Sequence, residues 1–189
     1  MLWKQFKKAN DLFFEKYNNA KGIVPKPRVN PILVALEGMA SEAEGLLKNQ
    51  NDFAAAADRA KQLLVNWKET SAKLKASMDR QLSERFRAAC DKIFEMNYLI
   101  RVIGYRHPFF NEKPRIEQLK IMINQMDYLV RKEKTDLMQF EENNPTTGYA
   151  RNAEADRMTM NKINTQRRKV AMKDILLIDF KKELDYLLR

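Results

Sequence analysis

The chain has 189 residues, of which 44% are hydrophobic and only five are glycine. This composition excludes a chain that is disordered throughout and is typical of a helical globular protein. Lysine and arginine outnumber aspartate and glutamate by 35 to 25, and the resulting charge of +10 is spread as +5 over residues 1–30, +2 over 31–110 and +3 over 111–189. The sequence therefore has no concentrated basic domain, although the excess favours polyanionic partners.

The single cysteine, Cys90, excludes an internal disulfide and fits a reducing compartment. No segment approaches the roughly 18 consecutive apolar residues that a membrane span needs. A signal peptide would need an apolar run near the N-terminus, where this chain has Lys4, Lys7 and Lys8. We therefore expect a cytoplasmic protein with no membrane partner.

Residues 1–21 are predicted to form one amphipathic helix, followed by a linker over residues 22–30. The apolar stripe of this helix consists of Leu2, Phe6, Ala9, Phe13 and Tyr17. Charged side chains, including Lys4 and Asp11, lie on the opposite side. Gly22, Pro25 and Pro27 are expected to end the helix.

Residues 31–110 are predicted to fold as three helices. Asn30 followed by Pro31 is typical of an N-cap and a first helical position. The expected apolar faces of the first two helices are Leu33, Leu36, Met39 or Ala40, Ala43 and Leu47, and then Phe53, Ala56, Ala60, Leu63, Leu64 and Trp67. The short break at residues 51–52 predicts an antiparallel pair. A third helix, over about residues 79–105, is expected to pack against that pair.

Residues 111–189 are predicted to form an antiparallel coiled-coil hairpin of two long helices, with a turn over residues 143–148. The expected seam positions, spaced by three and four, are Ile116, Leu119, Ile123, Met126, Val130, Glu133, Leu137 and Phe140, and then Ile163, Gln166, Val170, Lys173, Leu177, Phe180, Leu184 and Leu187. Glu133 and Lys173 are the charged members of the two seams. The sequence leaves open whether they pair, because it does not define the register.

The chain resembles itself at an offset of 80 residues. Six of the fourteen positions in 2–15 are identical to those in 82–95, where about one match is expected from ordinary residue usage. The identical pairs are Leu2 and Leu82, Phe6 and Phe86, Ala9 and Ala89, Asp11 and Asp91, Phe14 and Phe94, and Glu15 and Glu95. An internal repeat of this kind predicts a helical array that builds binding surfaces.

The second copy resembles the bacterial family called domain of unknown function 349, through Trp67-Lys68, Leu82, Phe86-Arg87, Ala89, Cys90-Asp91 and Phe94. Residues 2–15 are similar to the closing helix of a preceding copy, with Trp3, Phe6, Asp11, Phe13 and Phe14 matching. The resemblance implies tandem helical repeats, one partial and one complete, in a bacterial protein, either truncated or the C-terminal part of a longer array. The family's second tryptophan is Ser83 here. No catalytic residue is assigned in the family, so the resemblance implies none.

Residues suited to catalysis are scarce in this sequence. His107 is the single histidine and precedes Pro108, where it is expected to be a loop or capping residue. Cys90 lies on the packed side of its helix and is expected to be a buried structural thiol. No metal-ligand spacing, glycine-rich phosphate loop or triad pattern is present. We therefore expect no enzymatic activity, cofactor or metal.

A non-catalytic interaction or scaffold module is the expected role, with a protein partner or a second copy docking on the helical faces. The alternative is binding of RNA or the ribosome through basic residues. The candidate anion-binding residues are Lys4, Lys7, Arg85, Arg87, Arg167, Arg168 and Lys169. A basic residue precedes an aspartate by four in both copies, at Lys7 and Asp11 and at Arg87 and Asp91. One interpretation is that each aspartate accepts hydrogen bonds from a neighbouring helix end. The other is that the lysine and arginine side chains contact a phosphate backbone.

Overall fold

The computed structural model describes residues 2–21, 30–48, 52–74, 79–144 and 153–189. These ranges form α-helices and one short 3-10 helix, with no strand among them, which confirms the predicted all-α fold class. The helices are α1 (Leu2–Ala20), α2 (Pro31–Leu46), α3 (Phe53–Ser71), α4 (Arg80–Arg106), η1 (Phe110–Glu112), α5 (Arg115–Asn143) and α6 (Ala153–Leu187). The predicted breakers at 22–27 and 145–148 lie outside the described residues.

Side-chain caps begin three of the helices. The Asn30 side chain accepts a hydrogen bond from the Ile32 N–H at 3.0 Å, and Pro31 follows at the first helical position, as predicted. Asp52 accepts from two backbone N–H groups at the start of α3, and Asp79 accepts from the Gln81 N–H at the start of α4. These caps satisfy backbone donors that would otherwise have no partner in the helix, so the starts of α2, α3 and α4 are set locally.

The helices α2, α3 and the first half of α4 enclose one apolar core. The Trp67 and Phe86 rings stack at its centre, with their centroids 4.0 Å apart and an interplanar angle of 6°. Most of the predicted apolar positions are buried there, and alanines let the helices approach closely. The prediction that Leu33 and Leu64 belong to the packed faces is wrong. Each is 38% exposed, because it lies at the border of the apolar face of its helix.

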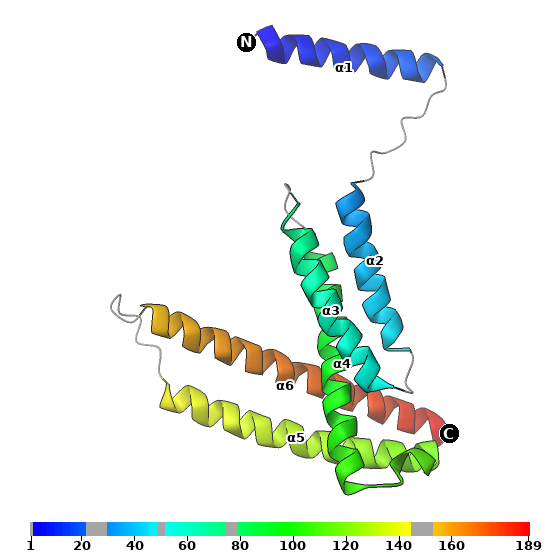
Figure 1. Cartoon of the computed structure of the whole chain (residues 1–189), viewed down its shortest axis with the longest axis vertical. Coiled ribbons are helices and arrows are strands. Elements are labelled where there is room, and N and C mark those ends of the chain that lie inside the picture. The colour runs from blue at the N-terminus through cyan, green and yellow to red at the C-terminus, as the bar shows by residue number, and fades with distance from the viewer. Residues whose placement is uncertain (1, 22–29, 49–51, 75–78, 145–152) are drawn as a thin grey trace.

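A second apolar core lies where the other half of α4 packs on α5 and α6. The helices α5 and α6 lie side by side and run in opposite directions (Figure 1). Leu119, Met126 and Val130 of the predicted seam are buried. Leu187, however, is 41% exposed, because it lies in the final turn of α6. Knobs-into-holes packing stays a prediction.

Each hairpin helix also buries residues outside the predicted seam, including Met122 and Leu129 on α5 and Leu176 on α6. These residues share the core that contains Leu99 and Ile103 of α4, so the hairpin helices are apolar on two sides. The two cores meet inside α4, between Ile93 and Met96. The sequence placed the boundary after this helix, at residue 110. One continuous helix therefore connects the three-helix unit with the hairpin.

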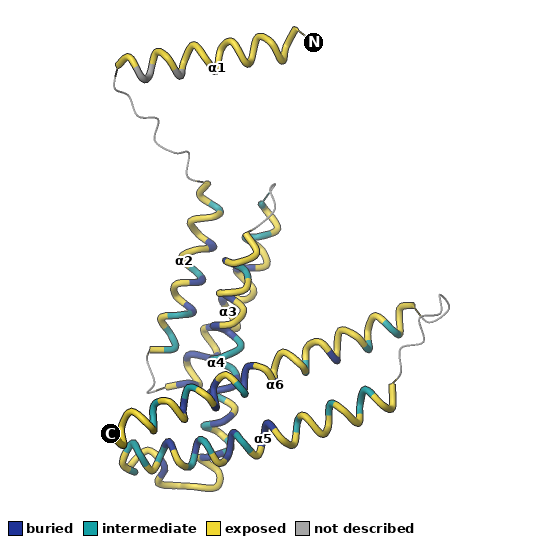
Figure 2. Tube along the Cα trace, turned by 180° about the vertical axis from the view of Figure 1, so that it is seen from behind, coloured by how far each residue is buried: buried dark blue, intermediate teal, exposed yellow. Residues whose placement is uncertain are grey.

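The helix α1 stands apart from all of the other helices (Figure 1). Figure 2 shows exposed residues along its whole described length, whereas α4 alternates between buried and exposed positions. None of the helices among the described residues combines the length and the apolar character needed to cross a membrane.

Candidate functional site

The apolar face of α1 is a row of large apolar side chains that are exposed. Its exposed fractions are 84% for Leu2, 75% for Trp3, 61% for Phe6, 62% for Phe13 and 43% for Tyr17. The aromatic rings contact one another along the helix, as in the stacked pairs Trp3–Phe6 and Phe13–Tyr17, and the Lys21 ammonium lies 4.8 Å from the centroid of the Tyr17 ring. We call these five residues the α1 face. A contiguous apolar surface of this kind marks an interaction site in a folded protein.

Three of the five counterparts of the α1 face are packed in α4. Phe86 and Ile93, which correspond to Phe6 and Phe13 at the offset of 80, are both 0% exposed. Leu82, the counterpart of Leu2, is 7% exposed. All three pack in the core formed with α2 and α3. The same side-chain pattern is therefore covered by two helices in α4 and uncovered in α1.

Two of the predicted anion-binding arginines pair with carboxylates of other helices. Arg85 donates to Glu44 and Glu37 of α2 over distances of 2.8–3.0 Å. Arg167 pairs with Glu141 at 3.0 Å across the hairpin. These residues join helices to one another, and the sequence pattern did not reveal their acidic partners because those partners lie on other helices.

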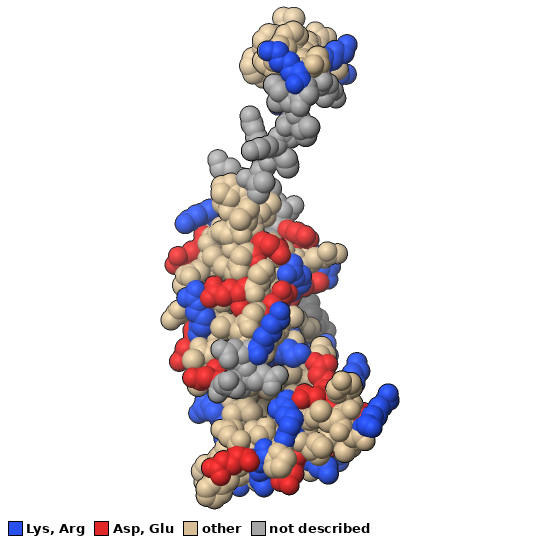
Figure 3. Space-filling model, turned by 90° about the vertical axis from the view of Figure 1, so that its right-hand side faces the viewer, with Lys and Arg blue, Asp and Glu red and all other residues tan. Residues whose placement is uncertain are grey.

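The Asp91 carboxylate brings together three other candidates. Arg168 of α6 pairs with it at 2.8 Å, and Arg87 and Lys169 lie close enough to act on it electrostatically. Burial nevertheless raises the pKa of Asp91, against the opposing effect of these cations. Asp91 thus accepts from the middle of α6 and not from a helix end. The remaining candidates, Lys4 and Lys7, are exposed on α1, and Figure 3 shows basic and acidic side chains intermixed over the visible face of the bundle.

A buried ionic cluster joins α4, α5 and α6. The Lys173 ammonium, 2% exposed, lies 2.6 Å from Glu95 Oε2 and 3.0 Å from Glu133 Oε2. Gln166 donates to the same Glu133 oxygen at 3.2 Å, and the Lys173 ammonium lies 5.8 Å from the centroid of the Tyr98 ring. The pairing of Glu133 with Lys173, which the sequence left open, is therefore made. Glu95 was missed, because it lies outside the apolar stripe that defined its helix.

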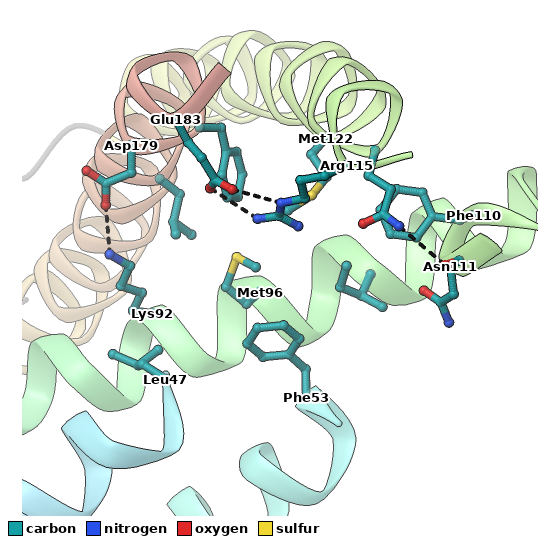
Figure 4. Close-up of a pocket in the computed structure, with 14 residues that line it drawn as sticks. Leu47, Phe53, Lys92, Met96, Phe110, Asn111, Arg115, Met122, Asp179 and Glu183 are labelled. Carbon is teal, nitrogen blue, oxygen red and sulfur yellow. Dashed lines mark hydrogen bonds and ion pairs between the residues drawn. The ribbon is translucent and has the colours of Figure 1, made fainter. Parts of the chain in front are cut away.

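A cavity of about 270 Å³ lies where the three-helix unit meets the hairpin (Figure 4). Its floor is apolar and includes Met96, Phe53 and Met122. Two ion pairs cross its rim, Lys92 with Asp179 at 2.7 Å and Arg115 with Glu183 at 2.8 Å. Because each cation in these pairs faces a carboxylate, the rim presents no surplus charge to an ionic ligand. The ion pairs join the hairpin helices to α4 and to each other.

The residues considered for catalysis are at structural positions. Burial, with a smaller contribution from the Asp91 carboxylate, raises the pKa of the Cys90 thiol to about 11. His107 is the C-cap of α4, as predicted, and its backbone N–H donates to the Ile103 carbonyl at 2.7 Å. Across the described ranges, no three side chains of His, Cys, Asp or Glu gather as a metal site would require. The α1 face is therefore the leading candidate for a functional surface.

Comparisons with protein-family models, with curated proteins and with solved structures found no match to this chain.

Proposed function

We propose that the chain is a non-catalytic helical interaction module of a bacterial cytoplasmic protein, and that the α1 face is its docking surface. The observation that carries the proposal is the exposure of Leu2, Phe6 and Phe13, whose counterparts in α4 are almost completely buried. The sequence repeat between residues 2–15 and 82–95 supports the same role, because helical repeats commonly present binding surfaces.

The chemistry of the α1 face favours a protein partner. Burying a large apolar side chain contributes about 1.5–3 kcal/mol relative to leaving it exposed, so a partner that covers the face gains substantial hydrophobic free energy. The rings of Trp3 and Phe6 already stack in the free helix, which reduces the conformational entropy lost on docking. An interface of this kind should resist salt, because it depends on burial more than on charge.

A second candidate function is RNA or ribosome binding, which the convergence of Arg87, Arg168 and Lys169 around Asp91 favours. A single carboxylate among three cations leaves a local positive surplus that phosphate groups would complement. Binding of this kind would weaken steeply as the salt concentration rises. The two candidates therefore make opposite predictions in one experiment.

The test is affinity capture with the tagged full chain from a lysate of the source organism, with and without ribonuclease, over a salt gradient. We expect a protein that resists both ribonuclease and salt, and that is lost with the variant Phe6→Ser/Phe13→Ser. The matched control is Tyr105→Ser/Phe109→Ser. It changes two exposed aromatic residues, Tyr105 in the last turn of α4 (92% exposed) and Phe109 just before η1 (67% exposed). This control should retain the partner.

Two outcomes contradict the interaction module. If the wild type and the Phe6→Ser/Phe13→Ser variant capture the same amount of partner, the α1 face is not the docking surface. Capture of RNA or ribosomal proteins that is lost with ribonuclease or moderate salt, and that is reduced by Arg87→Gln/Lys169→Gln, supports the second candidate instead.

A further inference from the structure

The helix α2 has a second face that no other described segment covers. Val34, Gly38, Ser41 and Gly45 are all exposed and follow one another at spacings of four, three and four residues along the solvent side of the helix. We call these four residues the outer face of α2. It lies opposite Leu36, Ala40 and Ala43, which are buried in the core of the three-helix unit.

None of the described residues explains the two glycines of the outer face. Both lie in regular helix, and a Cβ atom added to either would meet nothing within 4 Å. Glycine inside a helix is less stable than alanine, so two exposed glycines weaken α2. Their absent side chains leave a shallow strip along which another helix can approach closely.

We propose that α1 docks on the outer face of α2 in a second copy of the chain, and that the exchange is reciprocal. This inference rests on the proposed function and names the partner of the same α1 face. A dimer formed in this way has two identical interfaces related by a two-fold axis.

The packing of α4 on the inner side of α2 provides the physical precedent. There, Phe86 of α4 shares a core with Ala40 and Ala43 of α2, so large side chains of one helix meet small residues of the other. The α1 face repeats the large residues of α4 in sequence. The outer face of α2 repeats the small residues of its inner side. Large side chains can therefore pack against small residues on both sides of α2.

Charge favours this pairing over contact between two α1 helices. The helix α1 contains four lysines and two acidic residues, whereas α2 contains three glutamates and no basic residue. Glu42 pairs with Arg59, and Glu37 and Glu44 share Arg85. After these pairs, α2 keeps one surplus negative charge, which Lys48, just after the helix, balances through its electrostatic effect on Glu44. The helix α1, with two surplus positive charges, therefore meets no like net charge there. Two α1 helices would instead bring like net charges together.

The arrangement of the chain favours a second copy over docking within one molecule. In the structure α1 lies away from its own α2, so the two uncovered faces are open in the same molecule (Figure 1). A single contact between two helices buries little area. Reciprocal exchange doubles the buried area and brings it closer to the roughly 1,200 Å² at which specific interfaces become stable.

The test is sedimentation analysis of the full chain and of two variants, alone and mixed. We expect the wild type to be a dimer, and we expect both Phe6→Ser/Phe13→Ser and Gly38→Gln/Gly45→Gln to be monomers. The glycine variant should keep or increase its thermal stability, since glutamine favours helix and has open space at both positions. An equimolar mixture of the two variants should regain association, but more weakly than the wild type, because a heterodimer retains only one of the two interfaces, made by one intact α1 face and one intact outer face of α2.

The matched control is Gly104→Gln, at an exposed helical glycine of α4 where an added Cβ also meets nothing within 4 Å. This variant should remain a dimer. The proposal is overturned if Gly38→Gln/Gly45→Gln dimerises as the wild type does, which would indicate contact between α1 helices or another interface. A wild-type monomer whose Trp3 is protected from acrylamide quenching would overturn it in favour of docking within one chain.

Failure of this inference is distinguishable from failure of the proposed function. A wild-type monomer with Trp3 open to the quencher rules out the second copy. If lysate capture then still depends on Phe6 and Phe13, the interaction module stands with a different protein as its partner. If capture is also independent of these residues, both proposals fail.

Discussion

The helix α1 and the first half of α4 are the most informative comparison within this molecule. Six of fourteen residues are identical between 2–15 and 82–95, and both segments are helical. Phe86 nevertheless has an exposed fraction of 0%, whereas that of Phe6 is 61%. The difference lies in the neighbours, since α2 and α3 cover α4 and no described helix covers α1. Similar local sequences thus form a core element in one place and an open surface in another.

The largest expected effect is the difference in free energy of unfolding between the variants Phe86→Ala and Phe6→Ala. Phe86→Ala should lower the free energy of unfolding by about 3–5 kcal/mol, because it opens a cavity in the core and removes the stacking with Trp67. Phe6→Ala should change it by less than about 0.5 kcal/mol, as an exposed substitution does. Urea denaturation at protein concentrations where the chain is monomeric measures both. Equal losses would mean that α1 is packed within the monomer.

The next effect concerns the buried ionic cluster that α4 forms with α5 and α6. Lys173→Met should cost about 3 kcal/mol, because it leaves the Glu95 and Glu133 carboxylates buried without their cation. Adding Glu95→Gln should restore part of this loss, since one unpaired charge is removed. Lys169→Met, at an exposed position of the same helix, is the control and should remain within about 0.5 kcal/mol of the wild type. If Lys173→Met leaves the free energy of unfolding unchanged, the cluster adds no stability.

Thiol labelling compares equivalent positions of the two helices directly. Cys90 corresponds to Asn10 at the offset of 80, so Asn10→Cys places a thiol at the matching site of α1. At pH 8 Cys90 should react about 100-fold more slowly, because burial raises its pKa from the ordinary value of 9.0 to about 11 and only the thiolate reacts. Similar rates for the two thiols would show that α4 is not packed as described.

The pH dependence of this labelling has a defined sign. Because the pKa of Cys90 is raised in the fold, its reactivity should continue to rise with pH up to about 11, whereas that of Asn10→Cys should level off earlier. The protonated thiol also contributes stability that is present below its usual pKa of 9.0 and is lost as the pH rises towards about 11. Cys90→Ala should therefore reduce the alkaline loss of stability.

The smallest effect is expected at Arg85, whose counterpart in α1 is Gln5. Arg85→Gln makes the two helices alike at this position and removes the contacts with Glu44 and Glu37. The hydrogen bond from Arg85 lowers the pKa of Glu44, so its contribution is present above the usual value of 4.5 and is lost as the pH falls through the lowered pKa. The small decrease in melting temperature should disappear in acid and in high salt. A large decrease that persists in both would contradict a surface ion pair.

Local chemistry made much of the fold predictable. Asn30 and Pro31 marked the start of α2 because an N-cap and a first-turn proline act within a few residues of the chain. The apolar periodicity placed Phe86 and Leu119 correctly in cores, since the helical repeat decides which side chains share a face. Among the candidate site residues, sequence reasoning placed Arg85 and Arg168 on polar faces without revealing Glu44 and Asp91 as their partners.

The sequence by itself determined the helices, the Asn30 cap and most of the apolar positions, because these depend on interactions over one or two turns. Only the tertiary structure decided that Phe86 is covered and Phe6 is open, that Lys173 meets Glu95 as well as Glu133, and that one helix serves two cores. Coverage depends on which helices lie nearby in space. Periodicity along the chain carries no information about that arrangement.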